Sequence, residues 1–241
     1  METNGWASLG YIVELPGAFV RGKTQSEVLS KVNTEAKSYL DWLGIPAKPY
    51  YRTRVIQRHR CTLMVADADS EILLDEDKRA VSRGEFENLV ELVIYSGKTF
   101  LQLYRRAKLK DWVDEARIGK TFYGERPKTI REIYNHVKLT QYYYLSRTSI
   151  NFKQNEQSFI RIRKNCLEKL KQLFERSGNS VLFNLDNEKW TLKKILRRFV
   201  WHDRIHGKAI VRILEKQKQL GIISAYPDPF NFALTSTWFR R

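Results

Sequence analysis

The spacing of apolar residues changes near Glu85, and this change constrains the fold more than any other feature of the chain. Before Glu85, apolar residues alternate with polar ones in short runs, as in half-buried β-strands. After it they recur every three to four residues, as on the buried face of an amphipathic helix. The sequence therefore predicts a small α+β domain followed by an all-α domain.

Four amphipathic helices are predicted in the second domain. The second of them begins after Pro127, and proline suits the first turn because the N–H that it lacks would be unpaired there anyway. Four helices that each bury one apolar stripe are typical of a four-helix bundle. Their approximate ranges are 85–104, 128–144, 156–176 and 191–220.

An acidic stretch separates the two domains. Residues 67–77 show little apolar periodicity, as in a loop or linker. Nine basic and nine acidic side chains precede residue 76, so the net charge of +16 belongs to the rest of the chain. We predict an α+β domain at 1–72, an acidic linker at 73–83, the bundle at 84–220 and a C-terminal tail at 221–241.

The N-terminal domain is predicted to contain two strands, a helix and a further strand. Short apolar runs at 6–15 and 18–21 flank Pro16-Gly17, which predicts a hairpin. Thr24 and Glu27 have the spacing of a capping box, so a helix is expected to start there and to end near Gly44. The basic segment 50–65 is expected to form an edge strand.

Three of the four histidines fall on inward faces of the predicted helices. His202 and His206 lie four residues apart on the apolar stripe of the last helix, so both imidazoles can reach one ion. His136 lies on the inner side of the second helix. Three neutral imidazoles leave one coordination position for water or substrate, as in catalytic metal sites. We therefore predict a divalent metal site formed by His136, His202 and His206.

Histidine pairs at this spacing also have a simpler interpretation. On an exposed helix they are more often solvated or hydrogen-bonded than bound to metal. Burial favours the metal, because an unpaired buried imidazole costs about 1–3 kcal/mol in lost hydration.

Seven other residues were considered for the site. Glu132 is expected to pair with Arg131 or Lys128, or else to orient a ligand histidine, and Asp203 is expected to point away from the site. Gln141, Tyr143 and Tyr144 are expected to line the mouth of the cavity or to pack in the core. Cys166 is expected to pack in the core and His59 to face solvent.

The segment Glu14–Leu29, ELPGAFVRGKTQSEVL, resembles the signature of HicB-like domains. This resemblance covers about the first 65 residues, although Lys23 stands where the family usually has an acidic residue. It implies a partial ribonuclease-H-like fold. In antitoxins such domains bind a partner toxin and often self-associate, and elsewhere they are accessory modules. Residues 1–72 are therefore expected to form an accessory module, with a domain that binds a protein partner or a purely supporting domain as the alternatives.

Two segments of the predicted bundle resemble the DinB-like superfamily. They are the last-helix segment Glu188–Ile210 and the second-helix segment Lys128–Val137. The resemblance covers about residues 84–220 and matches all three metal-ligand positions of that superfamily, here His136, His202 and His206. It implies a four-helix bundle that binds a divalent metal, zinc or nickel. Characterised members include S-transferases and isomerases that use a low-molecular-weight thiol.

These observations predict a metal-dependent enzyme that activates a thiol or water for transfer or hydrolysis of a small-molecule substrate. The alternative is a non-catalytic interaction or nucleic-acid-associated protein with a structural metal, in view of the basic clusters. The cluster Lys193, Lys194, Arg197 and Arg198 falls on the face of the last helix opposite the histidines, where a solvated exterior is expected. A homodimer is also compatible with the sequence.

Composition excludes several other classes of protein. Hydrophobic residues form 42% of the chain, too many for global disorder. Two cysteines, Cys61 and Cys166, are too few for a disulfide framework. No apolar run is long enough to cross a bilayer, and the first residues lack the pattern of a signal peptide, so no membrane association and a cytoplasmic location are expected.

Overall fold

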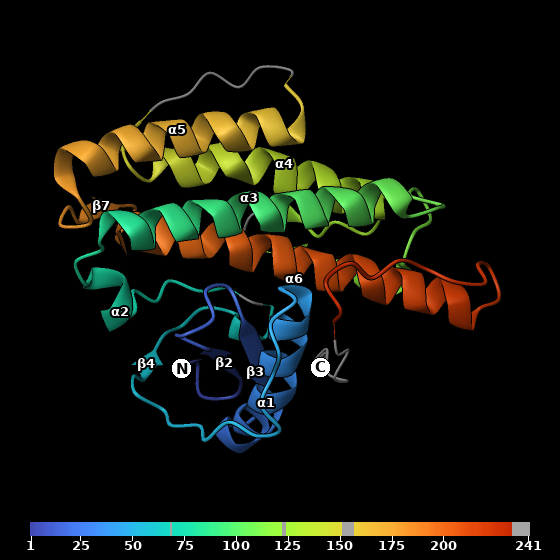
Figure 1. Cartoon of the computed structure of the whole chain (residues 1–241). Coiled ribbons are helices and arrows are strands. Elements are labelled where there is room, and N and C mark those ends of the chain that lie inside the picture. The colour runs from blue at the N-terminus through green and yellow to red at the C-terminus, as the bar shows by residue number, and fades with distance from the viewer. Residues whose placement is uncertain (68, 122–123, 151–156, 233–241) are drawn as a thin grey trace.

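A small N-terminal sheet with one helix lies against four long helices that pack on one another in the computed structural model (Figure 1). The structure describes residues 1–67, 69–121, 124–150 and 157–232. The protein is mixed α+β and mostly helical, with its strands concentrated near the N-terminus. Among the described residues, no helix combines the length and the apolar character needed to cross a membrane.

The N-terminal sheet has four short strands in the order β3-β2-β1-β4. Strand β2 pairs antiparallel with both β1 and β3, and β1 pairs parallel with β4. The predicted hairpin is therefore confirmed, with Leu9 opposite Arg21. The strands are β1 (Glu2–Thr3), β2 (Ser8–Tyr11), β3 (Phe19–Gly22) and β4 (His59–Arg60).

The expected strand at 50–65 is mostly wrong, because only His59 and Arg60 pair with the sheet. Upstream of them the backbone bonds to helix α1 (Gln25–Trp42) instead. The Tyr51 N–H donates to the Asn33 side-chain oxygen at 2.6 Å, and the Asn33 amide donates to the Tyr51 carbonyl at 3.1 Å. A side chain thus satisfies backbone groups that a strand ladder would otherwise use.

Helix α1 begins where the capping residues predict. The Thr24 hydroxyl accepts from the Glu27 N–H, and the Glu27 carboxylate accepts from the Lys23 N–H. These bonds satisfy donors that are left unpaired at a helix start. The helix ends before Gly44, whose φ of +68° suits glycine.

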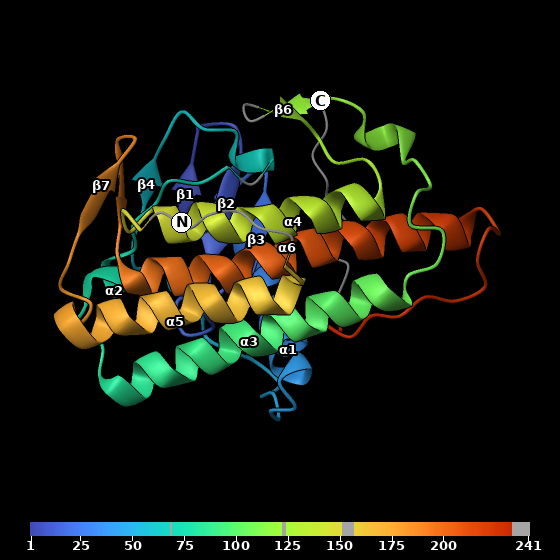
Figure 2. The ribbon, with the colours of Figure 1, turned by 90° about the horizontal axis from the view of Figure 1, so that it is seen from above.

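The four predicted long helices are all present. Each follows a Ser or Thr whose hydroxyl accepts a backbone N–H of the first turn, namely Ser82, Thr129, Ser158 and Thr191. They pack on one another as two pairs, because α6 contacts α3 and α4 and α5 contacts the same two helices (Figure 1 and Figure 2). They are α3 (Arg83–Arg106), α4 (Ile130–Ser146), α5 (Phe159–Ser177) and α6 (Leu192–Gln219). The expected start of the third helix, near 156, lies outside the described residues.

Shorter elements connect the helices. The predicted acidic linker contains one of them, α2 (Asp75–Lys78), and buries the side chain of Asp77. The C-terminal segment packs Phe230 and Phe232 against the helices, and residues 233–241 of the predicted tail lie outside the described part. Two others are 3-10 turns, at Val65–Asp67 and Glu115–Arg117. The rest are two hairpins: β5 (Lys120–Thr121) pairs with β6 (Gly124–Glu125), and β7 (Phe183–Leu185) pairs with β8 (Glu188–Trp190).

Helix α6 is buried around most of its circumference. On one side Ile195 and Phe199 belong to the core that it forms with the other long helices. On another side Trp201 and Ile205 pack with residues of the N-terminal sheet, including Phe19. The Trp201 and Phe19 rings meet edge to face, with centroids 6.2 Å apart. The sheet therefore covers a helix face that a bundle alone would leave in water.

This burial corrects the expectation for the basic cluster at the start of α6. Lys193, Lys194, Arg197 and Arg198 do not form a solvated exterior, because each is at most 8% exposed. They bond to acidic side chains and backbone carbonyls of other segments. Lys193 contacts Glu76 and Glu85, Lys194 contacts Glu188, Arg197 contacts Asp77, and Arg198 donates to the Ser70 carbonyl.

Gly17 lies where the hairpin touches α6, and we expect Gly17→Ala to destabilise the fold. Its φ is +88°, and an added Cβ would lie 2.6 Å from a Val200 methyl and 2.7 Å from the Trp201 backbone nitrogen. Left-handed strain of about 1–2 kcal/mol and overpacking of about 1–3 kcal/mol should lower the free energy of unfolding by roughly 2–5 kcal/mol, measured by urea denaturation.

Gly44→Ala is the matched control for Gly17→Ala. Gly44 also has a positive φ, +68°, but no atom lies within 4 Å of its added Cβ. This variant should lose only the backbone strain, about 1–2 kcal/mol. Equal losses in the two variants would show that the contact with α6 contributes nothing.

Candidate metal centre

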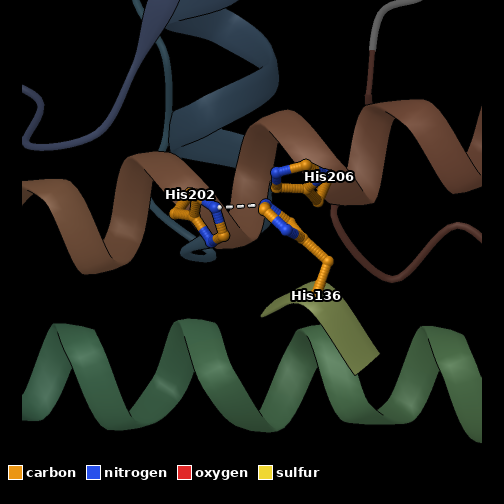
Figure 3. A group of neighbouring side chains, drawn as sticks. All are labelled: His136, His202 and His206. Atoms are coloured by element: carbon orange, nitrogen blue, oxygen red, sulfur yellow. Dashed lines mark hydrogen bonds between the residues drawn. The ribbon is translucent and has the colours of Figure 1, made fainter. Parts of the chain in front are cut away.

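His136, His202 and His206 meet between α4 and α6, as the sequence predicts (Figure 3). His202 and His206 project from the same side of α6 because they are one helical turn apart. Helix α4 packs along this side of α6 and points His136 at the pair. Neutral imidazole is a common metal ligand, and here two helices supply three of them.

The spacing of the three imidazoles fits one shared ion. One ligand atom from each residue can be chosen so that all three lie within 4.8 Å of one another. The Nε2 atoms of His202 and His136 are 3.2 Å apart. Two nitrogens bound to zinc at 2.0–2.1 Å with a tetrahedral angle would be about 3.3 Å apart. The separation of this pair therefore matches the geometry of two nitrogens that share a zinc ion.

The same separation also fits a hydrogen bond between two neutral imidazoles, one as donor and one as acceptor. In that arrangement the histidines would be a satisfied polar pair in the core. The third imidazole favours the metal interpretation. The His206 ring lies at least as close to its two neighbours as their own ring centroids, 5.1 Å apart, lie to each other. Its ring centroid is 4.3 Å from that of His202 and 4.7 Å from that of His136.

Burial keeps all three imidazoles neutral. It lowers the pKa of His136, and it lowers the pKa values of His202 and His206 well below the usual 6.5. Desolvation is the largest cause in each case, because an imidazolium ion loses its hydration inside the protein. The neighbouring histidines lower the pKa values of His202 and His206 further. Neutral nitrogens are the form that binds a metal.

The wall of the site is aromatic on the side of His202. The Tyr144 ring stands edge-on to the His202 ring, with centroids 5.6 Å apart, and Tyr144 also contacts Phe199. His202 is only 7% exposed, whereas His136 and His206 are half-buried. His202 is therefore shielded from solvent, whereas His136 and His206 keep part of their surface exposed.

Two arginines near the site, Arg21 and Arg117, were not predicted from the sequence. The charges of Arg117 and Arg21 add to the lowering of the His206 pKa. Arg21 lies on β3, in the predicted short strand, and donates to the Ala66 carbonyl at 2.7 Å. Arg117 lies in a connection between helices and donates to the Pro127 carbonyl at 2.8 Å. No local sequence pattern signals such a long-range approach.

Glu132 has neither of the roles expected for it. Its carboxylate accepts from the backbone N–H groups of Lys128 and Thr129 and so completes the capping box at the start of α4. Arg131, its expected partner, pairs with Asp111 instead. Glu132 therefore fixes the start of the helix that positions His136, one turn before the ligand.

The remaining candidates lie outside the cluster. Asp203 points away from the histidines, as predicted, and forms a buried ion pair with Arg163. Gln141 accepts a bond from Arg163 at 2.6 Å, so it does not line the site. Cys166 is buried and lies 3.7 Å from the Gln141 carbonyl oxygen, in agreement with a packing role. The other two are Tyr143, whose ring lies under the Arg147 guanidinium, and His59, which pairs with Glu71.

Comparison with known proteins adds no further constraint on the site. No family model, no curated protein and no solved structure matches the chain.

Proposed function

We propose that His136, His202 and His206 bind one divalent metal ion, zinc or nickel, in a DinB-like bundle. We propose further that the protein is an enzyme that activates a thiol or a water molecule for transfer or hydrolysis. The convergence of three neutral imidazoles from two helices is the observation that supports this proposal. It agrees with the resemblance of the segments Lys128–Val137 and Glu188–Ile210 to the ligand motifs of that superfamily.

A metal bound by three neutral ligands keeps its full charge and lowers the pKa of a coordinated water or thiol toward neutrality. The chain's own residues supply the rest of the site. The capping box of Thr129 and Glu132 fixes the start of α4 and thereby holds His136 in place. Tyr144 excludes water beside His202, and Arg21 and Arg117 favour an anionic group next to His206. A small anionic thiol suits this environment.

The nucleic-acid alternative loses one of the basic clusters that suggested it. Lys193, Lys194 and Arg197 are buried in ion pairs and so are not available to phosphate groups. The interaction alternative, in which residues 1–72 recruit a protein partner and the metal only stabilises the bundle, predicts metal binding without catalysis. The enzyme proposal and the interaction alternative therefore share the metal site and differ in whether the bound metal is catalytic or structural.

The direct test is metal stoichiometry. Protein purified without chelator and incubated separately with zinc or nickel should retain about one ion per chain after dialysis, measured by elemental analysis. His59→Ala removes the one histidine outside the cluster and should leave this stoichiometry unchanged. Less than about 0.1 ion per chain with both metals would contradict the proposal.

Reactivity is tested on a cobalt-substituted protein. If a thiol binds the metal, adding a small anionic thiol should produce a sulfur-to-cobalt charge-transfer absorption that is lost on addition of chelator. Bound metal without such a band, and without hydrolysis of ester or amide substrates, would favour the non-catalytic alternative.

A further inference from the structure

One face of α3 is uncovered by any other described element. Figure 2 shows α3 at the outer edge of the group of four long helices, and in Figure 1 its outer face is turned toward the viewer. Its exposed residues recur every three to four positions and form a continuous stripe about 30 Å long. They include Glu87, Glu91, Tyr95, Lys98 and Gln102.

The middle of this face is an apolar groove between α3 and the C-terminal end of α1. Its volume is about 570 Å³, and its lining includes Leu43, Val90, Ile94 and Tyr95. Tyr95 is 45% exposed, yet its position is fixed, because its hydroxyl donates to the Trp42 carbonyl at 3.1 Å. A rigid, half-exposed aromatic at the centre of an apolar groove is typical of a protein interface. None of the three clustered histidines lines this groove.

Two charges of opposite sign flank the groove. Glu91 lies on its side toward the N-terminus of α3 and Lys98 on its side toward the C-terminus, whereas Glu87 pairs with Arg83. Among the described residues, neither Glu91 nor Lys98 has an ion-pair partner of its own. They cannot pair with each other, because seven residues along a helix span about 10 Å. An exposed groove is thus bordered by one free carboxylate and one free ammonium group.

We propose that a second copy of the chain docks on this face, with the two α3 helices antiparallel about a twofold axis that passes between Ile94 and Tyr95. In this register, each residue faces the one whose number adds with its own to 189. Glu91 therefore faces the partner's Lys98, and Lys98 faces the partner's Glu91, since 91 + 98 = 189. The contact is isologous, as in most homodimers, so one favourable pair occurs twice.

A second copy fits this face better than an unrelated partner does. A partner of uniform charge would be attracted by one of these two residues and repelled by the other. The same face turned through 180° presents the opposite charge at both positions. Ile94 and Tyr95 of the two copies would meet at the axis and close the apolar groove to water.

The first measurement is the mass of the full-length protein in solution. A chain of 28.6 kDa should give a dimer of 57.2 kDa (2 × 28.6) in sedimentation equilibrium at micromolar concentration. A monomer at all concentrations up to about 100 μM would overturn the proposal. Because the groove excludes the histidines, this outcome would leave the proposed metal function untouched.

Charge reversal then tests the register. Glu91→Lys places two lysines opposite each other at both pair positions, and Lys98→Glu does the same with two carboxylates. Each single variant should weaken the dimer by about tenfold, because both symmetry-related pairs change from attraction to repulsion. Both residues are exposed, so the circular dichroism spectrum should not change.

Two rescues separate this register from any other interface. The double variant Glu91→Lys/Lys98→Glu restores opposite charges and should dimerise like the native protein. An equimolar mixture of the two single variants should also form a dimer, because each supplies the charge that the other needs. Glu168→Lys, on the exposed side of α5, is the matched control and should dimerise normally. A dimer insensitive to both single reversals, or a double variant that stays monomeric, would overturn the proposed register.

Discussion

Replacing His202 with alanine should weaken divalent metal binding at least about 100-fold. His202 is the least exposed of the three histidines, and its Nε2 lies 3.2 Å from that of His136. Removing it leaves two nitrogens from different helices, which no longer enclose an ion. Competition with a chromophoric chelator measures the loss directly.

Stability gives a second readout of the same substitution. A metal that binds only the folded protein raises the free energy of unfolding by about 2.7 kcal/mol at 100 times its dissociation constant. The native protein should therefore melt at a higher temperature when metal is added, and the His202→Ala variant should not. His59→Ala should respond like the native protein. Undiminished metal binding by both His202→Ala and His206→Ala would show that the ion binds elsewhere.

Asp203→Ala should be the most destabilising of the substitutions considered, with a loss of about 3–5 kcal/mol in the free energy of unfolding. Asp203 is fully buried and accepts two bonds from the Arg163 guanidinium, both of 2.9 Å. Arg163 is only 1% exposed, so removing the carboxylate leaves a positive charge with neither water nor a counterion. Chemical denaturation of the metal-free protein measures this loss without any contribution from the metal.

Two controls identify the buried charge as the cause. The double variant Arg163→Met/Asp203→Leu removes both charges and should recover about half of the loss or more. Asp186→Ala breaks the ion pair with Arg147, but Asp186 is 80% exposed, so this variant should lose less than about 1 kcal/mol. Similar losses for Asp203→Ala and the double variant would instead indicate that packing of the aspartate matters more than its charge.

Local signals in the sequence predicted the helices and the histidine cluster well. Thr24 caps a helix at the expected place, because a cap depends only on residues within one turn. Helices α4 and α6 begin at Ile130 and Leu192, within two residues of the predicted starts. His202 and His206 could be placed on one face because their spacing matches a helical turn. His136 needed only the inward side of its own helix to be identified.

Contacts between distant parts of the chain were the source of the errors. Lys193 and Arg197 look like surface residues, but their partners Glu85 and Asp77 lie more than 100 positions away. The short segment around Asp77 looks like a linker for the same reason. A prediction that places every charged residue on the surface cannot find such buried ion pairs, because neither residue of a pair has a local sequence pattern that marks it as buried. Arg21 and Arg117 near His206 were missed in the same way.

The cover that the N-terminal sheet provides for α6 has a consequence for biosynthesis. Phe19 is made 182 residues before its partner Trp201 (201 − 19 = 182), an interval of about 10–40 s at 5–20 residues per second. Throughout this time the side of the sheet that packs on α6 lacks that helix on the nascent chain. The exposed apolar surface is then of the kind that chaperones bind.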